Sequence, residues 1–275
     1  MHARMPWLCR VVLFSMSLSA GLAVFGCDAP SGADNGGEGP GHRAQTLGMS
    51  PQQELELGRK AYKEVLANPN KYGRVVPRDR PECQRIRGIA ERIIHAAGIE
   101  PLQREINLRQ SDHFEWEVNV LDKDQVNAFC LPGGKIVVFK GILPVAKNDD
   151  QLATVISHEI SHALAHHSSE RVARQEMNQQ GSGGIWSKSF DRQQETEADH
   201  IGLFLMTFAG YDPEEAIRFW ERMQQAGGGQ QRVPEILSDH PSDAHRIQSM
   251  KAWVPKAKAA KQAFDQGRIK PAPGR

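Results

Sequence analysis

Residues 155–175 read VISHEISHALAHHSSERVARQ and hold four histidines within ten positions. Asp149 or Asp150 offers a helix start just before this stretch. Apolar residues recur through it at helical spacing: Leu152, Val155, Ile156 and Ile160. The pattern therefore predicts an apolar-faced helix that carries the histidines.

His158 and His162 lie four residues apart in this predicted helix. That spacing puts both imidazoles on one face, about 6 Å apart along the helix axis. Two such side chains can bind one zinc ion at about 2.0–2.1 Å each. Glu159 points to one side of the pair, where it can accept a proton from a metal-bound water without being a ligand. The spacing predicts a hydrolytic metal site with Glu159 as general base.

A carboxylate for the third ligand position is available in ETEAD, residues 195–199. Glu195 and Asp199 share a helix face as i and i+4, whereas Glu197 points about 160° away. We expect Glu195 to bind the metal and to leave a fourth position open for water, as a catalytic zinc site requires. We expect Asp199 to accept the N–H of a metal-bound histidine and so fix its tautomer.

His166 and His167 follow the first two histidines in the same stretch. His166 continues the i, i+4 series, but three ligands on one straight helix would span about 12 Å by rise alone. That span is too long for one ion. We therefore expect His166 and His167 to be structural or surface residues.

The N-terminal segment looks like a targeting sequence. Arg4 and Arg10 are not balanced by any acid, and an apolar run of 15 residues follows before Gly26 and Cys27. This order is typical of a secretory signal, with an uncleaved anchor as the alternative. The ending VFGC resembles a bacterial lipobox, so Cys27 is expected to be the lipidated first residue of the mature chain. The predicted location is the bacterial cell envelope, facing the periplasm on a lipid anchor, with the leaflet left open.

Composition divides the chain into four predicted parts. They are a signal peptide (1–26), a flexible Gly/Ser/Pro tether (27–48), a metallopeptidase domain (49–265) and a C-terminal tail (266–275). Without the signal peptide, the chain has 32 basic and 33 acidic side chains. This balance predicts no basic face, so nucleic acid is not an expected partner.

Two further features leave alternatives open. Cys83 and Cys130 remain in the mature chain, either as one disulfide or as two buried thiols. The Gly/Gln-rich segment 177–189 is either a mobile lid over a cleft or a simple connection, and the connection is slightly favoured.

Other local patterns predict the remaining elements. Ser50 is a helix cap with Pro51 behind it. Alternation in FEWEVNVLD, residues 114–122, predicts a strand with one solvent-facing side, and Pro132-Gly133-Gly134 predicts a hairpin turn. Further helices are predicted over residues 50–68, 83–98, 191–210 and 212–229, and after the His240-Pro241 loop.

Five blocks of the chain resemble the prenyl-protease-like zinc metallopeptidases. They occur in family order: VNAFCLPGGKIVVFKGIL, VISHEISHALAHHSSERV, ETEADHIGL, FWERM and DHPSDAHRI. The resemblance covers about residues 50–255 and is strongest to the periplasmic outer-membrane assembly-factor type and the mitochondrial OMA-type protease. It implies an α+β fold, a mainly helical gluzincin domain with a small β-sheet packed on the active-site helices. It also implies one zinc ion per chain, held by His158, His162 and Glu195.

The same resemblance adds residues beyond the ligands. His240, in the family's His-Pro pair, is implied to lie near the metal, where it either stabilises the oxyanion or caps the zinc of an idle enzyme. Arg246 is implied to pair with Asp199 or Glu195. NAFCLPGG is implied to form an edge strand to which an extended peptide can add by main-chain hydrogen bonds. Cys130 departs from the small or aliphatic residue that is usual in the family.

These expectations lead to a zinc metalloendopeptidase that cleaves misfolded or stalled envelope proteins. The expected partners are unfolded or misassembled envelope proteins, and the membrane through the lipid anchor. The alternative is a chaperone-like zinc lipoprotein assembly factor whose proteolysis is normally shut off by His240. A purely structural zinc lipoprotein fits the general-base arrangement least well.

Overall fold

A four-stranded mixed sheet forms one layer of the protein. Its order is β3 (Arg74–Val75), β4 (Glu117–Asp122), β6 (Lys135–Phe139) and β5 (Ala128–Leu131). β4 and β6 run parallel, and the other neighbours pair antiparallel. The predicted hairpin joins β5 to β6, and Gly133 and Gly134 take the positive φ angles that its turn requires. The hairpin leaves β5 as one edge of the sheet.

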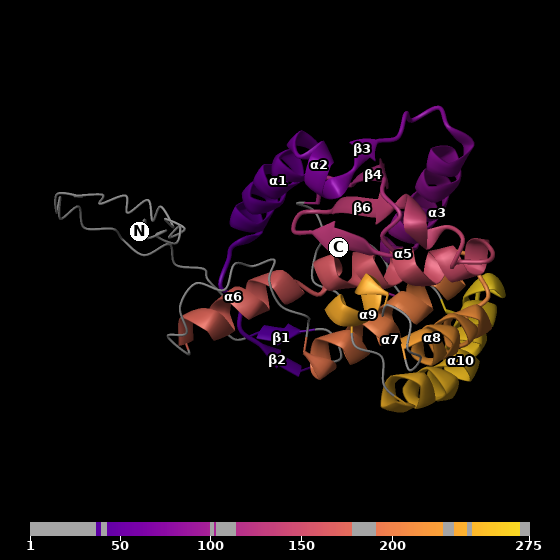
Figure 1. The fold of residues 1–275 in the computed structure, drawn as a ribbon. Coiled ribbons are helices and arrows are strands. Elements are labelled where there is room, and N and C mark those ends of the chain that lie inside the picture. The colour runs from indigo at the N-terminus through magenta and orange to yellow at the C-terminus, as the bar shows by residue number, and fades with distance from the viewer. Residues whose placement is uncertain are drawn as a thin grey trace, which may run out of the picture. The chain divides into compact units, whose positions relative to one another are not determined.

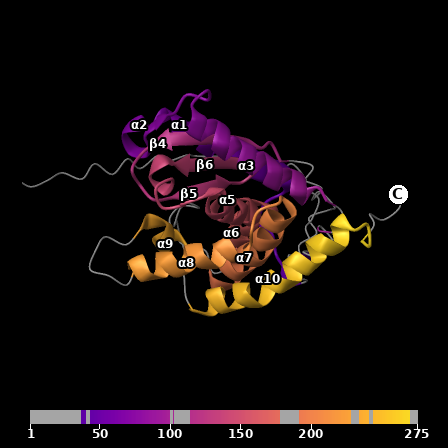
Figure 2. The ribbon, with the colours of Figure 1, turned by 90° about the vertical axis from the view of Figure 1, so that its right-hand side faces the viewer.

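Helices cover both faces of this sheet (Figures 1 and 2). α1 (Pro51–Ala67) packs Tyr62 and Val65 against one face, together with Val137 and Phe139. The alternate residues of β6 point to the opposite face, where α3 (Pro81–Ala97) and α5 (Asp149–Leu164) pack. The prediction that residues 114–122 have one solvent-facing side is therefore wrong. Val118, Asn119, Val120 and Leu121 are all buried, because β4 lies inside the sheet with helices on both sides.

Caps set where the helices begin. Ser50 caps the start of α1, as its position in the sequence predicts, and also forms a capping box with Gln53. α5 begins at Asp149, but Asn148 supplies the capping oxygen, which accepts from the N–H of Gln151 at 2.8 Å. α7 (Arg192–Phe208) begins after the cap Asp191. These caps fix the start of the two helices that carry the candidate site.

α5 and α7 lie side by side beneath the sheet (Figure 2). Their close approach depends on Gly202, where an added Cβ would lie 3.1 Å from the backbone nitrogen of His158. α8 (Glu214–Gly227) and α10 (Ala244–Asp265) pack on the far side of α7 and α5. Buried aromatic rings of Phe219 and Trp220 fill the space between them. The site helices are thus held between the sheet and an outer helical layer.

The sequence pattern did not predict the helix break that follows α5. The chain turns at His166, which has a φ of 52°, and α6 (His167–Met177) starts immediately afterwards. β2 (Arg43–Gln45) packs at this corner, where the Gln45 amide donates to the Ala165 carbonyl at 2.7 Å. β2 falls within the predicted tether, but it lies against the folded domain because its polar side chains find partners there. The short elements that remain are β1 (Gly37–Gly39), α2 (Pro69–Tyr72), η2 (Lys140–Ile142) and α9 (Glu235–Asp239).

This computed structural model describes residues 37–39, 43–99, 102, 114–177, 191–227, 234–240 and 244–269. The predicted signal peptide, Cys27 and residues 178–189 of the Gly/Gln-rich segment lie outside these ranges. Cys83 and Cys130 are free thiols, so the disulfide alternative is wrong. No helix in the described ranges is both long and apolar enough to cross a membrane.

Candidate active site

Four side chains from three segments converge beneath β5. They are His158 and His162 of α5, Glu195 of α7, and His240, which follows α9. Each offers one ligand atom, and these atoms all lie within 4.8 Å of one another. All four side chains are buried. The structure therefore brings together residues that are up to 82 positions apart in the sequence.

The spacing of these atoms fits the coordination shell of one metal ion. Nε2 of His158 lies 3.1 Å from Nε2 of His162 and 3.3 Å from Oε2 of Glu195. His162 Nε2 lies 3.5 Å from Oε1 of the same carboxylate. Four ligands at 2.0–2.1 Å from a tetrahedral zinc would be about 3.3 Å apart. Two imidazoles and one carboxylate are also the donor types that zinc takes in hydrolytic sites.

His240 lies at the fourth corner of this group. Its Nδ1 is 3.2 Å from His158 Nε2 and 3.0 Å from Glu195 Oε1. Its Nε2 is 3.2 Å from Oε1 of Glu159. His240 thus lies between the candidate ligands and the candidate base, where it can contact a group bound at either.

Glu159 lies next to the ligand group without being part of it. Its Oε2 accepts from the backbone N–H of Cys130 on β5 at 3.3 Å. Burial raises the pKa of Glu159, although His240 and His158 oppose that shift. A raised pKa makes this carboxylate a better proton acceptor than an exposed glutamate.

Asp199 and Arg246 support one side of the group. Nδ1 of His158 lies 3.1 Å from Asp199, which also accepts from Nε and Nη2 of Arg246 at 2.6 and 2.7 Å. Arg246 Nη1 lies 2.9 Å from Glu195 Oε2, so both partners considered for this arginine are contacted at once. Its guanidinium also packs over the ring of Trp220.

The charges of this site follow from these contacts. Burial would raise the pKa of Glu195, but His240 and Arg246 hold it well below its ordinary value. Burial also lowers the pKa of His162 far enough to keep its imidazole neutral. Glu195 and His162 are therefore in the forms that bind a metal, whereas Asp199 and Glu195 raise the pKa of His158 to about 9 against the opposite effect of burial.

His166 and His167 are both buried, so of the two expected positions, structural or surface, the surface one is excluded. The break before α6 turns His167 back toward His162, and their Nδ1 atoms lie 2.9 Å apart. His167 Nε2 lies 3.0 Å from Oε2 of Glu197, and burial keeps the pKa of His167 below its ordinary value despite that carboxylate. His166 instead pairs with Glu54 of α1 at 2.6 Å. The two adjacent histidines were the only hint of these contacts in this stretch of the sequence. The contacts themselves could not be predicted, because they depend on the helix break before α6.

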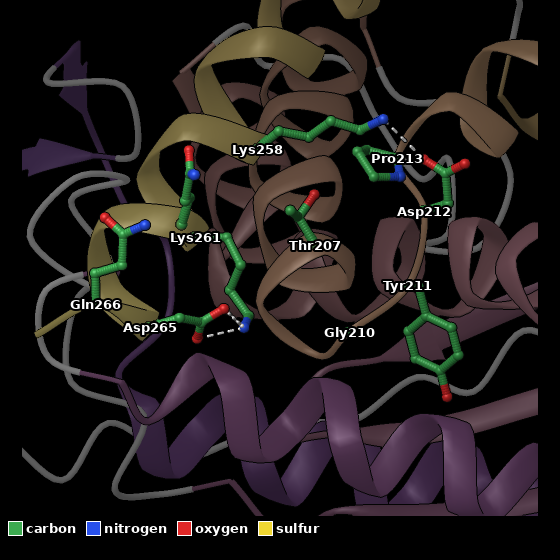
Figure 3. A pocket seen from close by; sticks show the side chains of 10 residues that line it. Thr207, Gly210, Tyr211, Asp212, Pro213, Lys258, Lys261, Asp265 and Gln266 are labelled. Atoms are coloured by element: carbon green, nitrogen blue, oxygen red, sulfur yellow. Dashed lines mark hydrogen bonds and ion pairs between the residues drawn. The ribbon is translucent and has the colours of Figure 1, made fainter.

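A separate surface hollow of about 500 Å³ lies where the end of α7 meets the end of α10 (Figure 3). Its lysines are neutralised by neighbours, since Lys258 pairs with Asp212 and Lys261 with Asp265. None of the four converging side chains lines it. The hollow is therefore distinct from the candidate site.

Comparison with known proteins agrees with this geometry. The model of the family described as Peptidase family M48 matches residues 91–185 and 182–254. "Mitochondrial metalloendopeptidase OMA1" of Schizosaccharomyces pombe is 35% identical over 231 residues, which is 77% of this chain and 64% of that protein. The protein of the same name from Saccharomyces cerevisiae is 34% identical over 78% of this chain and 68% of its own length. "Beta-barrel assembly-enhancing protease" of Escherichia coli is 28% identical over 46% of this chain and 32% of its own length. This chain thus spans about two thirds of the yeast relatives and less of the bacterial one.

These relatives correct the predicted location. The predicted location in the bacterial cell envelope is contradicted, because the yeast relatives are mitochondrial proteins. Shorter matches from a plant and from animals are mitochondrial as well, so the relatives point to a mitochondrial location instead. The signal peptide predicted over residues 1–26 is not tested by these comparisons and stays a prediction. The lipid anchor at Cys27 finds no support in these comparisons and stays a prediction.

The family assignment itself stands on agreement between sequence and structure. The His-Glu-x-x-His helix and the E-x-x-x-D helix pack together in a helical domain with a small mixed sheet, as the resemblance implies. The family model covers both helices and continues into α10. The chain belongs to peptidase family M48 and has the α+β metallopeptidase fold of that family.

Proposed function

We propose that this protein is a zinc metalloendopeptidase with the ion held by His158, His162 and Glu195. The observation that carries the proposal is the 3.1–3.5 Å spacing of their ligand atoms, with Glu159 beside them but outside the ligand set. When bound, zinc polarises the scissile carbonyl and lowers the pKa of an adjacent water. The names of the yeast relatives support the same activity.

Three residues near the metal ligands would carry out the other steps of hydrolysis. Glu159 takes a proton from the attacking water and passes it to the leaving amine, a role that its raised pKa favours. Asp199 holds His158 in the tautomer that keeps Nε2 free for the metal. His240 is placed to donate to the developing oxyanion.

The substrate class follows from the edge strand. β5 is at the edge of the sheet, and its Cys130 contacts Glu159, so an extended peptide added to β5 would pass the general base. Main-chain pairing of this kind selects unfolded segments rather than a particular sequence. We therefore propose misfolded or stalled proteins as substrates and quality control as the role. The proposed catalytic domain spans residues 49–265, with β2 packed on it.

Glu159→Gln tests the proposed activity. We expect cleavage of casein to fall by about 10²–10⁴-fold, because the general base is lost while the ligands stay in place. Zinc content, measured by elemental analysis of the purified protein, should be unchanged. Glu221→Gln is the matched control, because Glu221 of α8 is partly exposed and pairs with Lys251, and it should cleave at the wild-type rate. Normal cleavage by Glu159→Gln would reject the mechanism.

A second candidate, an assembly factor with proteolysis shut off by His240, is favoured by one contact. Nδ1 of His240 lies 3.0–3.2 Å from Glu195 and His158, where it can cap the ion. Under this alternative His240→Ala raises casein cleavage, because a coordination position becomes open. Equal or lower cleavage indicates the oxyanion role instead. His245→Ala, an exposed histidine of α10, is the control for general effects of histidine removal.

A further inference from the structure

A group of buried charges joins the N-terminal strand β2 to the site helices. Arg43 donates to both oxygens of Glu170 on α6, at 2.6 and 2.7 Å, and its Nη2 donates to Oε2 of Glu197 on α7 at 2.8 Å. Its Nε also contacts Glu197. The three side chains are 15%, 4% and 12% exposed, respectively. The proposed mechanism assigns no role to this arginine.

This group reaches the candidate metal ligands through one imidazole. Nδ1 of His162 lies 2.9 Å from Nδ1 of His167, and Nε2 of His167 lies 3.0 Å from Glu197. If His162 binds an ion through Nε2, its remaining proton is on Nδ1, which must donate to Nδ1 of His167. His167 then carries its own proton on Nε2 and donates to the Glu197 carboxylate. One tautomer of each ring satisfies all these contacts.

The two candidate histidine ligands are therefore supported in the same chemical way. His158 faces Asp199, whose carboxylate is held by the guanidinium of Arg246. His162 faces a carboxylate that is also held by a guanidinium, with one imidazole inserted between. Partners of this kind fix the orientation and the tautomer of a metal-bound histidine.

We propose that Arg43 is a positioning residue for the metal centre and acts on His162 through Glu197 and His167. The inference rests on the proposed function and deepens it, because it makes strand β2 part of the site. It does not place Arg43 in contact with substrate or metal. The expected effect of its loss is a drop of about 10–100-fold in metal affinity.

The test uses the full-length chain, freed of metal and titrated with Co²⁺ alone. Binding is followed by the visible absorption of the cobalt ion, which reports ligand geometry independently of catalysis. For Arg43→Met we expect a dissociation constant raised by about 10–100-fold and an altered spectrum. Arg43→Lys, which keeps the charge but loses the two-pronged hydrogen bonds, should recover part of the affinity. If Arg43→Met does not fold, Glu197→Gln tests the same link with nearly unchanged shape.

Two arginines provide controls. Both pair with carboxylates at exposed positions, Arg78 with Glu117 and Arg59 with Glu115. Arg78→Met and Arg59→Met should bind Co²⁺ as the wild type does. The inference is overturned if Arg43→Met and Glu197→Gln bind like the wild type, or if both controls lose as much affinity. A wild-type chain that binds no Co²⁺ would instead reject the proposed metal centre itself.

Discussion

At the scale of single residues, buried carboxylates are held in the ionised form by specific donors. Burial would raise the pKa of Glu170, but hydrogen bonds from Arg43 and Gln194 outweigh it and lower the pKa to about 2. The unfolded chain loses these donors, and a free glutamate titrates near 4.5. The ionised side chain therefore stabilises the folded state above about pH 4.5.

This difference predicts a stability loss in acid. As the pH falls from about 4.5 toward 2, the unfolded chain takes up a proton before the folded chain does, so the Glu170 contribution of about 3 kcal/mol at most is lost. Urea unfolding at pH 5 and pH 3 in the presence of EDTA should show a smaller loss for Glu170→Gln than for the wild type. Glu221→Gln should lose as much stability as the wild type. Equal losses in all three proteins would contradict the assignment.

Residue spacing was enough to predict part of the site. The i, i+4 relation of His158 and His162, and that of Glu195 and Asp199, depends on helix geometry alone, so their shared faces followed from the sequence. Glu197 was expected to lie off the ligand face, and it is not part of the converging group. Its contacts with His167 and Arg43 could not be predicted, because they depend on a turn and on a strand that come from elsewhere in the chain.

At the scale of elements, the contact between α5 and α7 sets the distance between the histidines and Glu195. Gly202 allows this contact, since a Cβ there would lie 3.1–3.3 Å from the backbone of His158 and Ser157. A larger side chain would have to move one helix away from the other. The ligand geometry therefore depends on one small residue outside the site.

Gly202→Leu is expected to weaken both folding and metal binding. Overpacking should cost about 1–3 kcal/mol of unfolding free energy and raise the dissociation constant for zinc. Gly88→Leu is the matched control, because a Cβ at Gly88 on α3 meets nothing within 4 Å. That substitution should be neutral or add up to about 1 kcal/mol. Urea midpoints and zinc competition with a chelating dye measure the two effects, and similar results for both leucine variants would contradict this account.

The elements that local chemistry defines were the ones predicted correctly. Ser50 and Pro51 mark the start of α1 in the sequence itself, and Pro132-Gly133-Gly134 marks the hairpin turn. The burial of β4 was not predicted because it comes from neighbours that are distant in sequence. The break at His166 was missed for a different reason: no glycine or proline marks it, and a non-glycine residue takes the left-handed backbone.

At the scale of the whole molecule, a bound ion would link segments that otherwise meet only through packing. α5, α7 and the residue after α9 each supply part of the group. A ligand that binds only the folded state adds RT ln(1 + [L]/Kd), about 4 kcal/mol at a thousandfold excess over Kd. Removing the ion should lower stability without removing the sheet and helix core.

Metal removal therefore gives the final prediction. The thermal midpoint should fall by several degrees when EDTA replaces zinc, while far-ultraviolet circular dichroism at 25 °C keeps its helical signal. Magnesium should not restore the midpoint, because it prefers six oxygen ligands. An unchanged midpoint would show that the group binds no ion in the folded protein.

The converging side chains also have a consequence for the timing of activity during synthesis. His158 is translated first, Glu195 follows it by 37 residues and His240 by 82 residues. A nascent polypeptide shorter than this cannot close the ligand group, since its final corner has not yet been translated. Because His240 is the last of the four side chains to be translated, the group can assemble only after the segment that follows α9 has been made.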